Sequence, residues 1–328
     1  MISLIATVLN EGEHVHRLLE SLVAQTRLPE EIVIVDGGSR DDTVANIEAY
    51  ADRLPLRVLA EPGCNISRGR NVAIAAAQGD IIAVTDFGVR LHDTWLETLI
   101  QPLLDDPERM VASGFFRAEM HTPFDVAMSA TVLPLRDEIN PATFLPSSRS
   151  VAFRKQAWEA VGGYPEWLDY SEDLVFDLRL KQRYGSFAFA PDALVDFRPR
   201  TSLRSFFKQY MLYARGDGKA DLWRKRHLIR YLTYLAAIPL IFVLGWRVHP
   251  LLWLLYAVGG AVYLAQPYRR LSTLHQWGPS LSAASTVYIA VLIPVIRVMG
   301  DIAKMIGYPL GLLWRWRVHP PDWRQSSK

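Results

Sequence analysis

The sequence predicts an α/β domain with a mainly parallel sheet, followed by a C-terminal part made of apolar helices. Up to about residue 225, short apolar runs rich in β-branched residues alternate with amphipathic helical patterns. This alternation is typical of a parallel sheet covered by helices. Further on, residues 231–267 contain one charged residue, Arg247, and residues 271–296 contain none. Because a bilayer core takes about 20 apolar residues per helix, this last third of the chain can enter a membrane.

The bulk composition excludes several classes of function. The chain has 328 residues, enough for one large or two medium domains. Its net charge of +2 gives no indication of nucleic-acid binding. The single cysteine, Cys64, rules out an internal disulfide and a cysteine-based metal site.

Helix signals separate the strands of the α/β part. Ser39 followed by Asp42 three residues later is a helix-start pattern, so the second helix is expected to begin there. The third helix is rich in alanine and is expected to end at Gly79. The strands are expected at residues 3–9, 31–36, 56–61 and 80–86.

Two acidic residues stand where such a sheet binds ligands. In parallel sheets the ligand site lies beyond the carboxyl ends of the strands, and Asp36 and Asp86 end the second and fourth strands. Asp36 opens the segment "DGGS", so capping a tight strand-to-helix turn is an alternative use of its carboxylate. No G-x-G-x-x-G pattern follows the first strand, which argues against nucleotide binding of the NAD type.

Further charged residues mark the starts of helices. Arg68 and Arg70 open the third helix, where arginines oppose the helix dipole unless an anion is near. A phosphate clamp and a solvated first turn both remain open for them. The adjacent acids Glu172 and Asp173 begin a later helix, after "GGYPEWLDYS". Aromatic side chains next to a carboxylate suit a sugar hydroxyl and its general base.

In this order, the segments resemble the inverting glycosyltransferases of family 2, which have the GT-A fold. "ATVLNEGEHVHRLLESLVAQT" resembles the opening strand and helix of that family. "EIVIVDGGSRDDT" resembles its V-D-D-G-S-x-D-x-T motif. "SRGRNVAIAAAQGDIIAVTD" resembles the approach to its metal motif, and residues 150–185 resemble its acceptor-side segment. The resemblance covers residues 2 to about 190.

The resemblance implies transfer of a sugar from a nucleotide-sugar donor of the UDP or GDP type. It makes Asp173 the general base, with Glu172 beside it, and Asp86 the first acid of a D-x-D motif and a metal ligand. These roles fit the chemistry, because an acceptor hydroxyl needs a base and a departing nucleoside diphosphate needs positive charge. The implied donor-binding residues are Thr7, Asn10 and Glu11 near the nucleoside, Asp36 at the base or ribose, and Arg68, Arg70 and Asp86 near the diphosphate.

The sequence departs from the family pattern at two glycines. Gly37 replaces the second Asp of the V-D-D-G-S motif, and Gly88 replaces the last acid of D-x-D. A divalent metal, Mg²⁺ or Mn²⁺, is therefore expected to be held by Asp86 with phosphate oxygens and water, and the activity is expected to depend only weakly on this metal. Arg198 and Arg200 offer positive charge near the donor, or else ordinary surface charge.

The region after the base also bears on the type of transfer. The processive members of the family carry Q-x-x-R-W, but no Arg-Trp follows Gln209 at that spacing. This argues for a single transfer rather than a polymerase. Residues 213–221 suit either a flexible loop or a helix end.

The C-terminal part is expected to form a membrane domain. A basic segment at 223–230 precedes the first apolar stretch, and Arg269 and Arg270 follow the second. This pattern predicts a hairpin with both ends in the cytoplasm, and hence an integral protein of the inner or plasma membrane with a cytoplasmic catalytic domain. A buried hairpin of a soluble domain is the alternative. The predicted borders are 1–222 for the catalytic domain and 223–328 for the membrane domain, with apolar helices at about 229–246, 250–267 and 279–297 and an interfacial helix at about 300–317.

A catalytic domain held at a membrane implies a lipid-linked or membrane-associated acceptor. The leading prediction is a membrane-bound glycosyltransferase that acts on such an acceptor in glycan or glycolipid synthesis. Direct transfer to polyprenyl phosphate is a close variant. A catalytically degenerate scaffold is the alternative from another class, motivated by Gly37 and Gly88.

Overall fold

The computed structural model describes residues 1–274 and 282–324. Packing divides the chain into two units. The sheet unit comprises Met1–Arg117, Arg136–Arg198 and the tail from Pro320. The helical unit comprises Ala118–Leu135 and Pro199–His319. The border predicted at residue 223 rests on membrane composition rather than on packing, and it stays a prediction.

Among the described residues, the sheet unit holds one eight-stranded sheet in the order β3-β2-β1-β4-β7-β6-β8-β5. The first four strands of that order run parallel, which confirms the predicted α/β fold with its parallel sheet. β7 is antiparallel to both β4 and β6, and β5 is antiparallel to β8. The strands are β1 (Ile2–Val8), β2 (Glu31–Asp36), β3 (Leu56–Ala60), β4 (Ile81–Val84), β5 (Val89–Leu91), β6 (Val111–Ala118), β7 (Val151–Arg154) and β8 (Ala188–Phe197).

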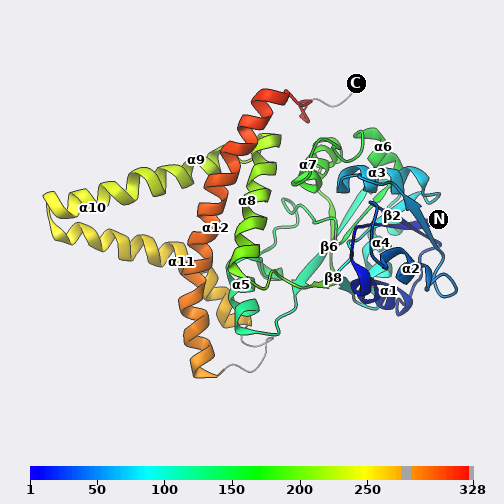
Figure 1. The fold of residues 1–328 in the computed structure, drawn as a ribbon, viewed down its shortest axis with the longest axis horizontal. Helices are drawn as coiled ribbons and strands as arrows, with labels where there is room; N and C mark the ends of the chain where they lie inside the picture. The colour runs from blue at the N-terminus through cyan, green and yellow to red at the C-terminus, as the bar shows by residue number, and fades with distance from the viewer. Residues whose placement is uncertain (275–281, 325–328) are drawn as a thin grey trace. The chain divides into compact units, whose positions relative to one another are not determined.

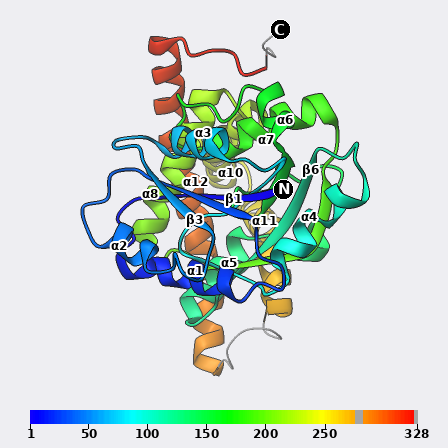
Figure 2. The same ribbon diagram turned by 90° about the vertical axis from the view of Figure 1, so that its right-hand side faces the viewer.

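Helices cover both faces of this sheet. They are α1 (Val15–Val23), α2 (Thr43–Glu48), α3 (Ile66–Ala76), α4 (Trp95–Asp105), α6 (Lys155–Ala160) and α7 (Glu172–Tyr184), with 3₁₀ turns at Gly12–His14 and Arg136–Glu138. Successive strand residues point to opposite faces, so Leu4 packs in the core with α1 and α4, and Ile5 packs in the core with α3 and α7. Figure 2 shows α1 and α2 on one side of the strands and α3 and α7 on the other.

Two of the predicted helix ends are wrong. The second helix begins at Thr43 rather than Ser39, because the Ser39 side chain is bonded to Asp36. The third helix ends at Ala76 rather than Gly79. Gly79 instead lies so close to β1 that a Cβ atom there would come within 2.7 Å of the Ser3 nitrogen. A close approach of two backbones therefore explains this glycine.

The helical unit is built from long helices. Figure 1 shows α9, α10 and α11 as a hairpin and α8 beside α12. Because α8 continues to Ala220, the segment from residue 213 is helical rather than a loop. The elements are α5 (Pro123–Val132), α8 (Leu203–Ala220), α9 (Arg224–Leu232), a π-helical turn (Thr233–Ala237), α10 (Ile238–Arg247), a 3₁₀ turn (Pro250–Trp253), α11 (Leu254–Leu274) and α12 (Ala283–Val318).

Glycines let α8 and α12 pack at very short range. A Cβ atom at Gly307 would lie 2.0 Å from the Met211 carbonyl oxygen, and one at Gly311 would lie 2.1 Å from that of Arg215. Neither position has room for any side chain. Small residues at a helix–helix contact are typical of helices that pack in or near membranes.

The hairpin exposes its apolar side chains. Two stretches, Arg224–Arg247 and Pro250–Leu274, are long and apolar enough to cross a membrane. Leu235 is 66% exposed and Val262 is 75% exposed. These stretches contain the predicted helices at 229–246 and 250–267.

The third predicted apolar helix and the interfacial helix form one continuous helix, α12. Residues 279–281 of the third prediction lie outside the described residues. The amino-terminal half of α12 is only partly exposed, because Ile289, Ile293 and Ile296 are buried in a core with α5.

Candidate active site

The carboxyl ends of the parallel strands and the first turn of α7 bring charged side chains together in the sheet unit. Asp86 follows β4 by two residues, Arg70 lies on α3, and Glu172 is the first residue of α7. Arg70 joins the other two: its Nη2 donates to Asp86 Oδ1 at 2.7 Å, and its Nη1 donates to Glu172 Oε1 at 2.9 Å. The structure thus unites three predicted site residues that lie far apart in the chain.

Arg70 is buried, not solvated. Its side chain is 3% exposed, and its guanidinium lies over the Tyr164 ring at 5.3 Å from the centroid. The solvated first turn considered for this residue is therefore wrong. Its two neighbouring carboxylates, rather than water, compensate its charge.

A second arginine approaches Asp86. Arg149 Nε lies 3.9 Å from Asp86 Oδ2, and the Arg149 guanidinium lies over the Phe197 ring at 5.0 Å. Burial alone would raise the pKa of Asp86, but the charges of Arg70 and Arg149 outweigh it and hold that pKa below the usual value. Asp86 therefore stays ionised.

The sequence reasoning missed Arg149. β4 and β7 pair antiparallel with Val84 opposite Val151, so the residue two before Val151 lies near the residue two after Val84. That register places Arg149 beside Asp86. Nothing in the local sequence signals this pairing, because β7 lies more than 60 residues beyond β4 in the chain.

The acids of α7 are held in a poorly solvated place. Burial and the charge of Asp173 together raise the pKa of Glu172 to about 7, against the opposing charge of Arg70. Burial also raises the pKa of Asp173, again against the charge of Arg70. Asp177, one turn further on, has a pKa raised well above its usual value by burial and by Asp173. A carboxylate with a raised pKa is a stronger base, which suits proton abstraction from a hydroxyl.

Asp36 organises the turn after β2. It accepts hydrogen bonds from the backbone nitrogens of Gly38 and Ser39 and from Ser39 Oγ, the last at 2.6 Å. The turn-capping use of Asp36 is therefore present. Its contact with a base or ribose stays a prediction.

The two departures from the family motifs differ in their backbone. Gly88 has a φ of +80°, a left-handed conformation that side chains rarely adopt. The backbone of an aspartate would be strained at that position. The left-handed turn at Gly88 therefore explains why the second D-x-D carboxylate is absent. Gly37 has an ordinary φ, and a Cβ atom there would meet its nearest neighbours at 3.6 Å. An aspartate would fit there.

The predicted nucleoside-binding residues border the same end of the sheet. Thr7 is half-buried on β1 and packs against Gly69 of α3, where a Cβ atom would lie 2.9 Å from Thr7 Cγ2. Asn10 has a φ of +52°, and its Oδ1 accepts from the Arg40 nitrogen. The Glu11 nitrogen donates to Thr43 Oγ1. These contacts shape the loop, and the nucleoside roles stay predictions.

The other predicted arginines are more exposed than Arg70. Arg68 is half exposed, and its Nε donates to Glu61 at 2.7 Å. Arg198 is the last residue of its segment of the sheet unit, and Arg200 belongs to the helical unit. Both are exposed, and their roles at the donor stay predictions.

The protein offers one predicted metal ligand. Within residues 1–274 and 282–324, no group of three or more His, Cys, Asp or Glu side chains could hold a metal ion. Asp86 is ionised and 24% exposed, so it fits a hard cation only as one ligand among others. Diphosphate oxygens and water would have to complete the coordination.

Comparison with known proteins shows similarity to one family model and to curated proteins. The model of the family "Glycosyl transferase family 2" matches residues 3–159. The chain is 27% identical over 301 residues to the succinoglycan biosynthesis protein ExoA of Rhizobium meliloti, covering 85% of this chain and 88% of that protein. It is 25% identical to the pre-mycofactocin glycosyltransferase of Mycobacterium tuberculosis, covering 95% of this chain and 66% of that longer protein.

A solved structure shares the fold. The mannosyltransferase PcManGT from Pyrobaculum calidifontis, solved in complex with GDP-Man and Mn²⁺, has a TM-score of 0.55 at 17% identity. The similarity covers 96% of this chain and 86% of that one.

Proposed function

The chain belongs to glycosyl transferase family 2 and has the GT-A fold; from this premise we propose that it is a membrane-bound, inverting enzyme. It transfers a sugar from a nucleoside-diphosphate sugar to a lipid-linked or membrane-associated acceptor. The observation that carries this proposal is the buried network in which Arg70 joins Asp86 to Glu172, directly beside Asp173.

Asp173 acts as the general base of the transfer. Its raised pKa strengthens it as a base, and it lies at the start of α7 next to the Arg70 network. As the acceptor hydroxyl attacks C1 of the donor sugar, the proton passes from that hydroxyl to the Asp173 carboxylate. The bond between C1 and the diphosphate oxygen breaks, and its electron pair leaves with the nucleoside diphosphate. One displacement from the opposite face inverts the anomeric centre.

Positive charge near Asp86 supports the leaving group. Arg149 reaches Asp86 from the start of β7 and supplies positive charge there. This charge compensates for the glycine at position 88, which cannot hold a metal cation as an acid would. When bound, a Mg²⁺ or Mn²⁺ ion held by Asp86 and phosphate oxygens would supply further positive charge and stabilise the negative charge of the leaving diphosphate. The GDP-Man and Mn²⁺ bound to PcManGT support a nucleotide-sugar donor and a role for a metal.

The exposed hairpin supports a membrane location. Its two apolar stretches bury few of their side chains, and large exposed apolar surfaces mark membrane or partner contacts. A membrane-held catalytic domain suits an acceptor in the same membrane, such as a polyprenyl-linked saccharide. The name of ExoA, a succinoglycan biosynthesis protein, is compatible with such a role in glycan assembly.

Transfer by the purified protein tests the proposal. Full-length protein is reconstituted in vesicles that contain polyprenyl diphosphate-linked saccharides or polyprenyl phosphate, and it is given radiolabelled UDP- and GDP-sugars. We expect label in the lipid extract, a loss of about 10²–10⁴-fold in Asp173→Asn, and a slower but measurable rate after EDTA treatment. Asp52→Asn, at an exposed turn, is the matched control and should keep its activity. No transfer or donor hydrolysis with any donor would favour a scaffold.

A further inference from the structure

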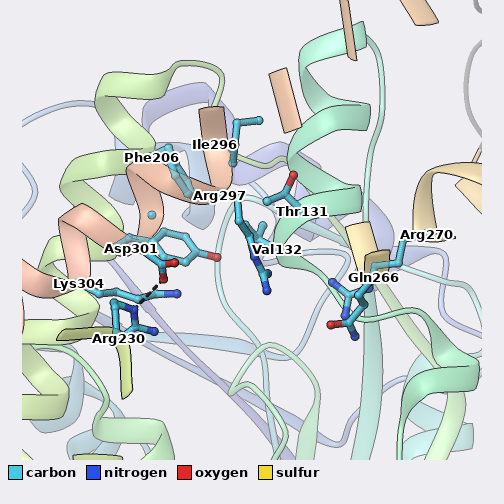
Figure 3. A pocket seen from close by; sticks show the side chains of 12 residues that line it. Thr131, Val132, Phe206, Arg230, Gln266, Arg270, Ile296, Arg297, Asp301 and Lys304 are labelled. Carbon is cyan, nitrogen blue, oxygen red and sulfur yellow. Dashed lines mark hydrogen bonds and ion pairs between the residues drawn. The ribbon is translucent and has the colours of Figure 1, made fainter. Parts of the chain in front are cut away.

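The helical unit contains a cavity of about 260 Å³. Figure 3 shows its side chains converging from α5, α8, α9, α11 and α12. The charged and amide side chains that line it are Arg230, Gln266, Arg270, Arg297, Asp301 and Lys304.

Positive charge exceeds negative charge around this cavity. Among the described residues that line it, four are cationic and one, Asp301, is acidic. Both oxygens of Asp301 already have partners. Arg230 Nε donates to Oδ1 at 2.7 Å, and the Tyr263 hydroxyl donates to Oδ2 at 2.6 Å. Asp301 therefore cannot compensate all of the surrounding cations.

Two of the cations lie over aromatic rings. The Arg297 guanidinium lies 4.9 Å from the Tyr263 ring centroid, and Lys304 Nζ lies 5.0 Å from that of Tyr210. Burial, with the charges of Arg230 and Arg297, lowers the pKa of Lys304 to about 8. Like charges held together in a poorly solvated place are relieved by an anion. An anion in the cavity would raise that pKa again.

The cavity lies at the open end of the hairpin. Arg230 is near the start of the first apolar stretch and Arg270 is near the end of the second, whereas the turn between the stretches lies at residues 248–249. A helix from Arg230 to Arg247 is about 25 Å long, close to the thickness of a bilayer core. When the hairpin crosses a membrane, the cavity lies at the level of the lipid headgroups.

We propose that this cavity binds the phosphate or diphosphate group of a membrane lipid. Arginine and lysine side chains between helices at the membrane surface are suited to anionic headgroups. Gln266, Thr131 and Tyr210 supply further polar groups in the lining. The proposal rests on the membrane location proposed above but not on the transfer chemistry.

Binding of a short phosphorylated lipid to the full-length protein tests the proposal. Protein in a neutral detergent is titrated with farnesyl phosphate, and binding is followed by native mass spectrometry and by the rise in unfolding temperature. We expect saturable binding that farnesol does not reproduce. The double variant Arg297→Gln with Lys304→Gln should weaken binding at least 10-fold. Equal binding of farnesol, or unchanged binding by the double variant, would overturn the proposal.

Matched variants separate loss of the site from loss of the fold. Lys225→Gln with Arg226→Gln removes two exposed cations of α9 that do not line the cavity, and it should bind within twofold of the wild type. Arg297→Lys keeps the charge and should keep most of the binding. If these control variants lose as much affinity for farnesyl phosphate as Arg297→Gln with Lys304→Gln, the binding is not specific to the cavity.

Two further binding measurements identify which phosphate-bearing molecule the cavity binds. Dioctanoyl phosphatidylglycerol that binds as tightly as farnesyl phosphate identifies a general anionic-lipid site, and weaker binding identifies a site for isoprenoid phosphates. Inorganic phosphate that displaces farnesyl phosphate at equal concentration would overturn the lipid assignment. Asp173→Asn, which removes the proposed general base, should bind farnesyl phosphate like the wild type. The binding result is therefore independent of whether the proposed sugar transfer takes place.

Discussion

In each unit a charged side chain lies among charges of the opposite sign, and the signs are reversed between the two units. In the sheet unit, Arg70 lies between Asp86 and Glu172, with Asp173 close by. In the helical unit, the acidic residue Asp301 lies among cations that include Arg230 and Lys304. The first cluster is rich in carboxylates and suits proton abstraction. The second is rich in cations and suits an anionic ligand.

The clusters also differ in whether they are closed. Arg70 lies between two carboxylates and is 3% exposed, so its charge is compensated within the cluster of the sheet unit. Around Asp301, the cations border a cavity of about 260 Å³. In the closed cluster, the single central ion compensates the opposite charges around it. In the open cluster, part of the surrounding positive charge faces the cavity and can bind an anionic ligand.

Removing the minority ion of the closed cluster should have the largest effect on stability. Arg70→Met removes the partner of Glu172, which is 10% exposed, and the nearer of the two arginines at Asp86. Breaking a buried pair in this way costs about 3–5 kcal/mol of unfolding free energy. The pKa of Asp86 should also rise, because the Arg70 charge holds it down. Thermal unfolding of the full-length protein in detergent measures the loss.

Arg68→Met is the matched control for this prediction. Arg68 lies on the same helix but is 51% exposed and pairs with Glu61 at the surface. Surface pairs contribute about 0–1 kcal/mol, so this variant should unfold near the wild-type temperature. Equal destabilisation by the two variants would show that Arg70 is not the centre of a closed cluster.

The burial of Arg70 could have been predicted more sharply from the sequence. Arg70 lies three and four residues before Ala73 and Ile74, the apolar side chains that α3 buries, so the helical period places it on the inner face. Arg68 lies two residues away and points outward. The sequence interpretation treated both as one pair of helix-start charges. It therefore found the residue but not its partners.

The parallel half of the sheet was predictable because its signals are local. Each of β1 to β4 is a short apolar run bounded by turn residues or a helix pattern, and all four were predicted within two residues of each observed end. The position of Arg149 depends on the pairing of β7 with β4, which no local pattern encodes. The cavity of the helical unit likewise joins residues from five helices. In the sequence these cations resemble ordinary positive charge beside a membrane segment.

A second prediction concerns the helical unit, where glycines let α8 pack closely against α12. Gly307→Ala places a methyl group 2.0 Å from the Met211 carbonyl oxygen, so the helices must separate. Overpacking of this kind costs about 1–3 kcal/mol, seen as a lower unfolding temperature. Gly259→Ala is the control, since a Cβ atom there meets nothing within 4 Å. A similar loss in both variants would contradict the close contact.

A third prediction uses the raised pKa of Glu172. The pKa is about 7 in the folded protein and 4.5 for the free side chain. The group therefore favours folding below pH 4.5, and this contribution is lost as the pH rises through 7. For activity, ionisation of Glu172 near pH 7 adds negative charge beside Asp173 and strengthens it as a base. We expect kcat/KM to rise in two steps with pH.

Glu172→Gln should remove the upper step and keep the lower one. The rate at pH 8 should fall less than about 10-fold, because Asp173 remains as the base. A pH profile measured from pH 5 to 9 gives both steps, and Asp137→Asn, which changes an exposed acid of a 3₁₀ turn, serves as the control. An inflection near pH 7 that persists in Glu172→Gln would show that another group titrates there.

The smallest effect is expected where an ion pair is fully accessible to water. Arg136 Nη1 lies 2.7 Å from Asp192 Oδ1, a shorter contact than that of Arg70 with Glu172, but the two side chains are 53% and 70% exposed. Water screens this pair, and holding both side chains in place costs conformational entropy. Arg136→Gln should therefore change the unfolding free energy by less than about 1 kcal/mol. A loss comparable to that of Arg70→Met would mean that distance rather than burial governs these pairs, and the contrast between closed and open clusters would lose its physical basis.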